Sequence, residues 1–188
     1  MFRMYLELGF DHISDLKGYD HILFIIALCA AYALSDWKRI LILVTAFTIG
    51  HSVTLALSSL HVVNLPPGFI ELMIPITILA TAFQNLWYKA DSSTLWTPTY
   101  FLAVFFGFIH GLGFANYFKA LLGKEASIIV PLFGFNLGVE LGQLCIVACI
   151  LALNYLFIKL TRASQRNWTI PVSIIAALLS IVMIIQRF

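Results

Sequence analysis

Charged side chains are scarce in this chain of 188 residues. Lys, Arg, Asp and Glu together make up 11% of it, whereas 61% is hydrophobic. A soluble domain of average composition carries about a quarter charged residues. The chain therefore has too little polar surface to cover a globule in water, which excludes an ordinary soluble fold. The formal net charge of +2 is spread along the sequence, so nothing resembles a basic nucleic-acid-binding face.

The N-terminus lacks the apolar run of a secretory signal peptide, and the cysteines lack the number expected of a disulfide framework. Charges occur throughout residues 1–18, so we expect the mature protein to begin at Met1. The three cysteines are Cys29, Cys145 and Cys149, and all lie in apolar runs. An odd number in such surroundings argues against disulfides, and packing is a simpler role than soft metal ligation.

Long apolar runs rich in Leu, Ile and Phe are what the chain does contain. A membrane-spanning helix needs about 20 apolar residues, and these runs show none of the alternation typical of a membrane β-barrel. We therefore predict an all-α integral membrane protein, a bundle of six transmembrane helices that forms a single polytopic domain over residues 1–188. The expected spans are approximately 20–35, 40–60, 68–88, 98–118, 129–158 and 169–186.

The first 18 residues are too charged to span the lipid bilayer. We predict that they form a short interfacial segment, with four side chains partly buried: Met4, Leu6, Leu8 and Phe10. Lys and Arg divide almost evenly between the two sides of the predicted topology. The most basic single loop, at 159–167, favours a cytoplasmic position, so both termini are expected outside.

Histidines and carboxylates occur in or against the predicted spans, where an ionisable group is costly and usually marks a site. Asp20 and His21 stand at the start of the first span in "GYDHILF", and His51 lies in "FTIGHSVTL". His110 lies in "FGFIHGLGFA", and Glu140 in "GFNLGVELGQ". At about 1.5 Å per residue, His51, His110 and Glu140 all fall near mid-bilayer. The acid and imidazole of the first span fall nearer the outer surface.

The fifth span carries two different faces. Glycines recur every four residues on one face, and polar side chains lie on nearly the opposite one; the two sets are Gly134, Gly138 and Gly142, and Asn136, Glu140 and Gln143. Small residues let a neighbouring backbone approach closely. We interpret the first face as a helix–helix contact and the second as the wall of a polar pocket.

Imidazole and carboxylate groups that meet within a membrane suit a borderline divalent cation. Neutral imidazole is a good ligand for zinc, nickel and related ions, and a carboxylate compensates their charge. A buried histidine can also serve packing alone, through a hydrogen bond to a neighbouring helix. Three histidines with acids at comparable heights favour the metal site over this simpler alternative.

Four motifs in this order resemble the HupE/UreJ family of bacterial membrane proteins: "HISDLKGYDHILF", "FTIGHSVTLAL", "FGFIHGLGFA" and "FNLGVELGQ". The resemblance implies a nickel or nickel/cobalt permease of the bacterial inner membrane. It assigns metal uptake to His12, Asp20 and His21 of the first motif.

In the other three motifs, the resemblance points to His51, His110 and Glu140. Two departures from the family pattern concern the charge and spacing of the site. Gln84 stands where an acid is usual, and the spacing from His12 to Asp20 is two residues longer than in typical members.

Three functions follow from these observations. The first is transport of a divalent transition-metal ion (nickel or similar) across the inner membrane, through a His/carboxylate site at mid-bilayer. The second is an intramembrane zinc-dependent hydrolase that uses the same cluster, with one open position on the metal for water. The third is a membrane subunit whose polar core serves packing only. The cation is nickel, zinc or cobalt, and the expected metal ligands are His12, Asp20, His21, His51, His110 and Glu140.

Overall fold

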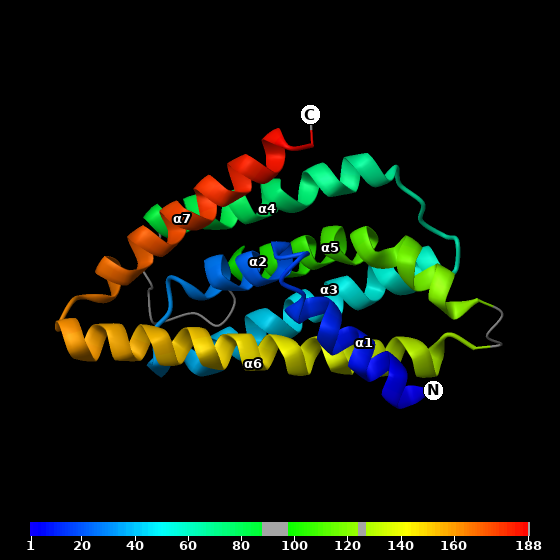
Figure 1. Cartoon of the computed structure of the whole chain (residues 1–188), viewed down its shortest axis with the longest axis horizontal. Coiled ribbons are helices and arrows are strands. Elements are labelled where there is room, and N and C mark those ends of the chain that lie inside the picture. Colours follow the sequence, from blue (N-terminus) through cyan, green and yellow to red (C-terminus); the bar gives the residue numbers. More distant parts are fainter. Residues whose placement is uncertain (88–97, 124–126, 188) are drawn as a thin grey trace.

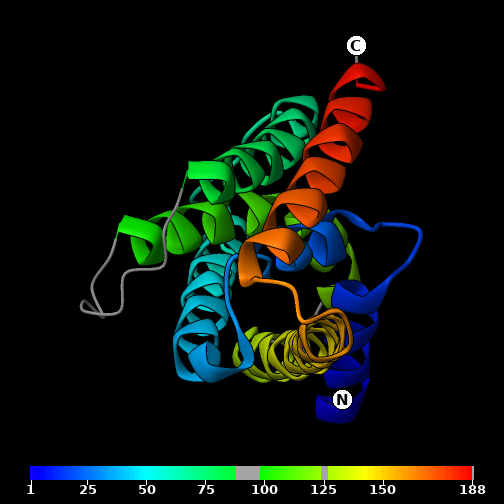
Figure 2. The same ribbon diagram turned by 90° about the vertical axis from the view of Figure 1, so that its left-hand side faces the viewer.

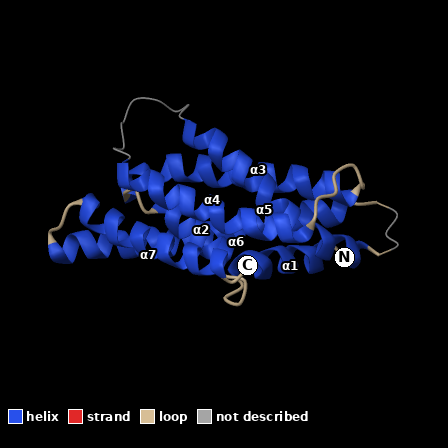
Figure 3. Ribbon diagram, turned by 90° about the horizontal axis from the view of Figure 1, so that it is seen from above, coloured by secondary structure: helices blue, strands red, loops and turns tan. Residues whose placement is uncertain are grey.

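The computed structural model describes residues 1–87, 98–123 and 127–187, and every regular element in these ranges is a helix (Figure 1 and Figure 3). The seven α-helices and one 3₁₀ turn are α1 (Phe2–Ser14), α2 (Asp20–Cys29), η1 (Leu34–Asp36), α3 (Trp37–Ser59), α4 (Pro67–Trp87), α5 (Pro98–Leu122), α6 (Ile129–Thr161) and α7 (Gln165–Ile185). This confirms the all-α class that the apolar runs predict.

Five of the described helical segments are long and apolar enough to cross a membrane, and they correspond to the predicted spans two to six: Leu34–Ser59, Pro67–Trp87, Thr99–Leu122, Ile129–Thr161 and Gln165–Ile185. The first predicted span, 20–35, differs, because α2 ends at Cys29 after ten residues. The described residues thus form five long apolar helices and two shorter ones, and the predicted count of six spans is not confirmed.

The helices pack most closely in three pairs, α3 with α5, α1 with α6, and α4 with α7. Figure 1 shows α6 running the length of the molecule, with α1 crossing beside its first half. We call the end where α1 begins the N-terminal end, and the end that holds the α6–α7 turn the opposite end. Both α1 and α2 run toward the opposite end, one after the other, whereas α3 and α5 run toward the N-terminal end.

Glycines bring α3 and α5 into backbone contact. A Cβ atom added at Gly107 would meet the carbonyl oxygen of Phe47, and one at Gly111 would meet the carbonyl oxygen of His51. On the other helix, a Cβ at Gly50 would meet the carbonyl of Val104. Such close approach is how membrane helices gain packing contacts without a hydrophobic drive between them. It also fixes His51 relative to the helix that carries His110.

The glycine face of α6 receives α1, which confirms the helix–helix contact predicted for that face. A Cβ at Gly138 would meet the carbonyl oxygen of Leu6, and one at Gly9 would meet the carbonyl oxygen of Phe135. The N-terminal segment is therefore a helix docked lengthwise on a long apolar helix. Its buried residues differ from the expected four: Tyr5, Gly9 and Ile13 are buried, Leu6 and Leu8 are partly buried, and Met4 and Phe10 are exposed.

Helix α2 can end early because side chains of other helices donate hydrogen bonds to the carbonyl oxygens at its end. Asn85 of α4 donates to the carbonyl oxygen of Ala27 at 2.7 Å, and Thr169 of α7 donates to that of Ala30 at 2.8 Å. Gln165 donates to the carbonyl oxygens of Ala30 and Tyr32. A helix end buried in apolar surroundings needs such partners. With these partners in place, α2 can end inside the bundle without leaving its last carbonyls unpaired.

Replacing Thr169 with valine should destabilise the protein by about 1 kcal/mol, because the buried Ala30 carbonyl loses a donor while side-chain volume is conserved. The free energy of unfolding in detergent, measured for the variant and the wild type, checks this. Thr161→Val is the matched control, because that exposed hydroxyl bonds to nearby backbone: it donates to the carbonyl oxygen of Phe157 and accepts the N–H of Ala163. Equal stability of the two variants would contradict a capping role for Thr169.

Candidate metal centre

Three imidazoles from three helices converge inside the bundle. His12 lies near the end of α1, His21 in the first turn of α2 and His51 in the middle of α3. Each offers one ring nitrogen, and these nitrogens all lie within 4.8 Å of one another. Two nitrogens on one tetrahedral metal lie about 3.4 Å apart, given metal–nitrogen bonds of about 2.1 Å. A small inward movement of the rings would therefore bring all three onto a single ion.

Four ring nitrogens of this group have no hydrogen-bond partner within the part of the chain that the structure describes. His51 is completely buried, and neither of its ring nitrogens has a hydrogen-bond partner. The Nε2 atoms of His12 and His21 are also buried without a partner. A buried polar atom left unpaired costs free energy, so such atoms are rare and call for an explanation. A set of converging, unpaired imidazole nitrogens fits a bound transition-metal ion.

Asp20 orients one of these rings. Its Oδ1 atom lies 2.9 Å from Nδ1 of His21 and also accepts the backbone N–H of the same residue. Because a carboxylate accepts and Nδ1 donates, the free lone pair of the imidazole is placed on Nε2. Carboxylate partners of this kind fix the tautomer of metal-binding histidines and raise their basicity. The carboxylate also places an acidic group directly beside the His21 ring.

Exchanging Asp20 for asparagine should weaken metal binding by about 10- to 100-fold, because an amide neither carries the charge nor holds the tautomer as firmly. Isothermal titration of the purified protein with nickel measures the effect. Asp15→Asn is the control, because this exposed side chain bonds only to the backbone N–H of Lys17. Unchanged affinity of the Asp20 variant would show that the carboxylate does not support the centre.

His110 stands next to the group of three. Its ring centroid lies 5.2 Å from that of His21, and the side chain is completely buried. Its Nδ1 donates to the carbonyl oxygen of Phe106 at 2.9 Å, so the lone pair lies on Nε2, which has no partner among the described residues. The third motif, "FGFIHGLGFA", therefore contributes a further imidazole nitrogen at the edge of the centre.

Glu140 lies on another face of α6. Its Oε1 accepts a hydrogen bond from Thr45 at 2.6 Å, while Phe135 is the residue of this helix whose ring lies near His12 and His51. Five residues separate Phe135 from Glu140, which places the two side chains about 140° apart around the helix. The structure therefore brings Glu140 to the contact between α3 and α6, outside the group of imidazoles.

Aromatic rings that the sequence analysis did not single out surround His12. Phe114 of α5 lies 3.9 Å from its ring, and Phe135 of α6 lies 5.6 Å from it. These apolar rings lower the local dielectric around the imidazoles, which strengthens charge interactions there. Phe114 was visible in the sequence four residues after His110, but nothing there indicated that α1 would lie against it.

An open hollow of about 690 Å³ leads to His12 from outside. It is lined by the end of α1, by the connection at 15–19 and by Phe114 and Tyr117 of α5. Figure 2 shows this connection extending from the side of the bundle. Asp11, Asp15 and Lys17 are among the residues that line it together with His12, so carboxylate groups share the hollow with this histidine.

The whole chain matches one known family. A family model described as HupE / UreJ protein covers residues 1–188. The chain belongs to the HupE/UreJ family. Members of this family are generally associated with nickel or cobalt transport. The five long apolar helices of this chain agree with a membrane protein of that family. No significant match was found among curated proteins or among solved structures.

Proposed function

We propose that this HupE/UreJ protein carries a divalent transition-metal ion, nickel or a similar ion, across the bacterial inner membrane. One observation supports this most strongly: three imidazoles from separate helices, two buried and one partly buried, present unpaired nitrogens to a common point. Imidazole favours nickel, cobalt and zinc over the hard cations magnesium and calcium. The ion is the cargo, bound by His12, His21 and His51, with His110 next to them and Asp20 behind His21.

The arrangement of α1 and α2 supports a transport route. The two helices follow each other along the bundle and are interrupted at 15–19, beside the histidines (Figure 1). We propose that together they form the first of six membrane crossings. Broken helices at mid-membrane are a common way to build an ion site in transporters, because the break frees polar groups for a ligand. Glu140, which lies outside the imidazole group, is proposed to act on the transport cycle from the α3–α6 contact.

Metal binding by imidazole also provides a means of release. The ligand nitrogens must be unprotonated to hold the ion, so protons and metal compete for the same lone pairs. A proton that reaches His12 through the outer hollow would weaken the hold on the ion. The hydrolase alternative gains no support from the family match.

Uptake by sealed vesicles tests the function. Purified protein is reconstituted, nickel is added outside, and the metal retained after washing is measured with and without a proton gradient. We expect saturable uptake that cobalt inhibits and magnesium does not, compared with vesicles that lack protein. A protein that binds nickel at the histidines yet moves none under a gradient of either sign would contradict transport and leave a metal-binding membrane subunit.

A further inference from the structure

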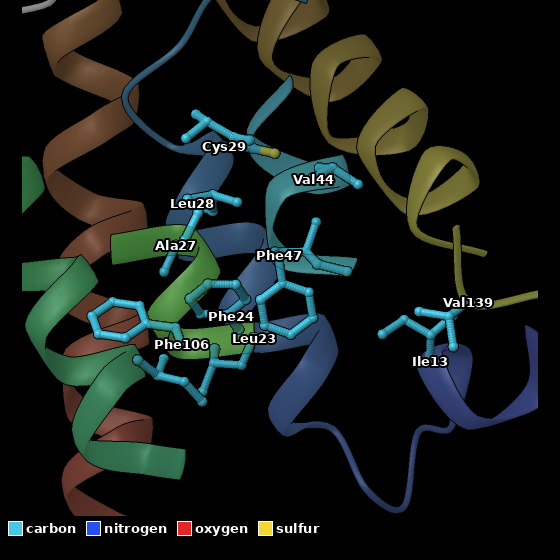
Figure 4. Close-up of a cluster of buried hydrophobic side chains, with 14 of the residues drawn as sticks. Ile13, Leu23, Phe24, Ala27, Leu28, Cys29, Val44, Phe47, Phe106 and Val139 are labelled. Carbon is cyan, nitrogen blue, oxygen red and sulfur yellow. The ribbon is translucent and has the colours of Figure 1, made fainter. Parts of the chain in front are cut away.

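A layer of three phenylalanines lies directly beyond the histidines. Phe24 of α2 stacks on Phe47 of α3 with 4.9 Å between ring centroids, and Phe106 of α5 meets Phe24 edge-on at 6.0 Å. Figure 4 shows the ring of Phe24 between the other two. All three are buried, with 1%, 1% and 7% of their surface exposed. Three buried phenylalanine rings in mutual contact thus make up an apolar layer.

The sequence spacing puts each phenylalanine one helical turn from a histidine. Phe24 follows His21 by three residues, Phe47 precedes His51 by four, and Phe106 precedes His110 by four. Residues three or four apart share a helix face. Helix α2 runs toward the opposite end, so Phe24, which follows His21, lies nearer that end (Figure 1). Helices α3 and α5 run away from that end, so Phe47 and Phe106, which precede their histidines, also lie nearer it. The rings therefore form a layer about one turn, or 5.4 Å, beyond the imidazoles.

The two layers are in direct contact. The ring of His110 lies 5.2 Å from Phe24 and 5.1 Å from Phe47, and the ring of His51 lies 6.1 Å from Phe47. An ion that leaves the histidines toward the opposite end meets these rings first. A dry apolar layer opposes the passage of a charged ion, which is how hydrophobic constrictions close channels.

A small cavity of mixed lining touches this layer at Phe106. Apolar side chains make up most of its wall, and Thr81, Gln84, Asn85 and Thr99 supply its polar atoms. Its volume of about 10 Å³ is at the lower limit of the space that one water molecule needs. The amide N–H groups are already engaged, since Gln84 donates to Thr99 and Asn85 donates to Ala27 and Ser173. In these hydrogen bonds both amide groups act as donors, so the bonds do not occupy the amide oxygens.

We propose that the three phenylalanines form a closed gate and that the small cavity against Phe106, with its amide and hydroxyl groups, is a second site, which receives the divalent cation after the histidines release it. This inference rests on the transport function proposed above. Amide and hydroxyl oxygens hold a borderline cation less tightly than imidazole does. The second site is therefore suited to release, and the ion passes when the Phe106 ring turns away.

The gate is tested by Phe106→Ala in sealed vesicles with a nickel gradient and no other driving force. Removing the ring opens the apolar layer, so downhill flux should rise by about tenfold, while nickel affinity of the purified protein stays that of the wild type. Phe101→Ala is the matched control on the same helix, because that ring is 69% exposed on the outer surface. Flux that is unchanged or lower in the Phe106 variant, at wild-type affinity, overturns the gate.

The second site is tested by Gln84→Leu, which removes an amide oxygen and leaves the three phenylalanines unchanged. Flux should fall by about tenfold without a change in histidine affinity, and Gln84→Glu, which keeps an oxygen ligand, should restore it. Wild-type flux in Gln84→Leu overturns the second site. This variant can be measured even if Phe106→Ala fails to fold. A wild-type protein that binds nickel but carries no flux overturns the transport function itself, which distinguishes the two failures.

Discussion

Replacing His51 with alanine is expected to lower the nickel affinity of the purified protein by about 100-fold and to abolish uptake by vesicles. His51 is the most enclosed member of the group, with both ring nitrogens unpaired, and its removal leaves only His12 and His21 on the ion. Loss of a supporting group alone weakens metal sites by about 10- to 100-fold, so loss of a ligand should reach the upper end of that range. Isothermal titration and metal uptake measure the two effects.

The control for this experiment is His61→Asn. His61 is exposed between α3 and α4 with a positive φ of 60°, a conformation that asparagine tolerates. This variant should bind and transport as the wild type does. If His51→Ala folds and retains wild-type affinity, the converging imidazoles are a packing feature, and the metal centre and the transport function are both wrong.

The second large effect is expected from Gly138→Ala, which changes no polar group. A methyl group at this position would overlap the backbone of Leu6 and Phe10, and backbone atoms cannot turn aside as a side chain can. Helix α1 must therefore move away from α6, and His12 moves with it. We expect nickel affinity to fall by about tenfold and stability to fall by about 1–3 kcal/mol, measured by titration and by thermal unfolding in detergent.

Gly68→Ala is the comparison for this variant, since nothing lies within 4 Å of a Cβ atom at Gly68. It should match the wild type in both measurements. A Gly138 variant with lower stability but full affinity would show that His12 is not needed at the centre. The pair of variants therefore separates the role of the docked N-terminal helix from a general loss of packing.

Much of the fold could be predicted from apolar run length alone. Five long helices lie close to their predicted ranges because about 20 apolar residues and a polar break define a span with little ambiguity. The end of α2 at Cys29 could not be predicted in this way. The residues that follow, "AAYALS", are nearly as apolar as the helix. The chain can leave the helical path there because Asn85, Gln165 and Thr169 donate hydrogen bonds to its carbonyl oxygens.

The candidate site was partly predictable as well. The rule that an ionisable group in an apolar span marks a site selects His21, His51 and His110, and the structure brings these rings together. His12 lies outside any apolar run, so only the family resemblance pointed to it. The depth of Glu140 in the membrane suggested that it would join the group. Depth, however, does not determine toward which neighbouring helix a side chain points. The rotation of α6, set by its glycine face against α1, turns that carboxylate toward Thr45.

The pairing of helices has a consequence for motion. His51 and His110 belong to the α3–α5 pair, and His12 to the α1–α6 pair. His21 stands on α2, which Asn85 and Thr169 fasten to α4 and α7. A single ion held by His12, His21 and His51 would thus cross-link three separately braced bodies. Loading would draw them together and unloading would free them to slide, so the cargo itself would set when the bundle can change shape.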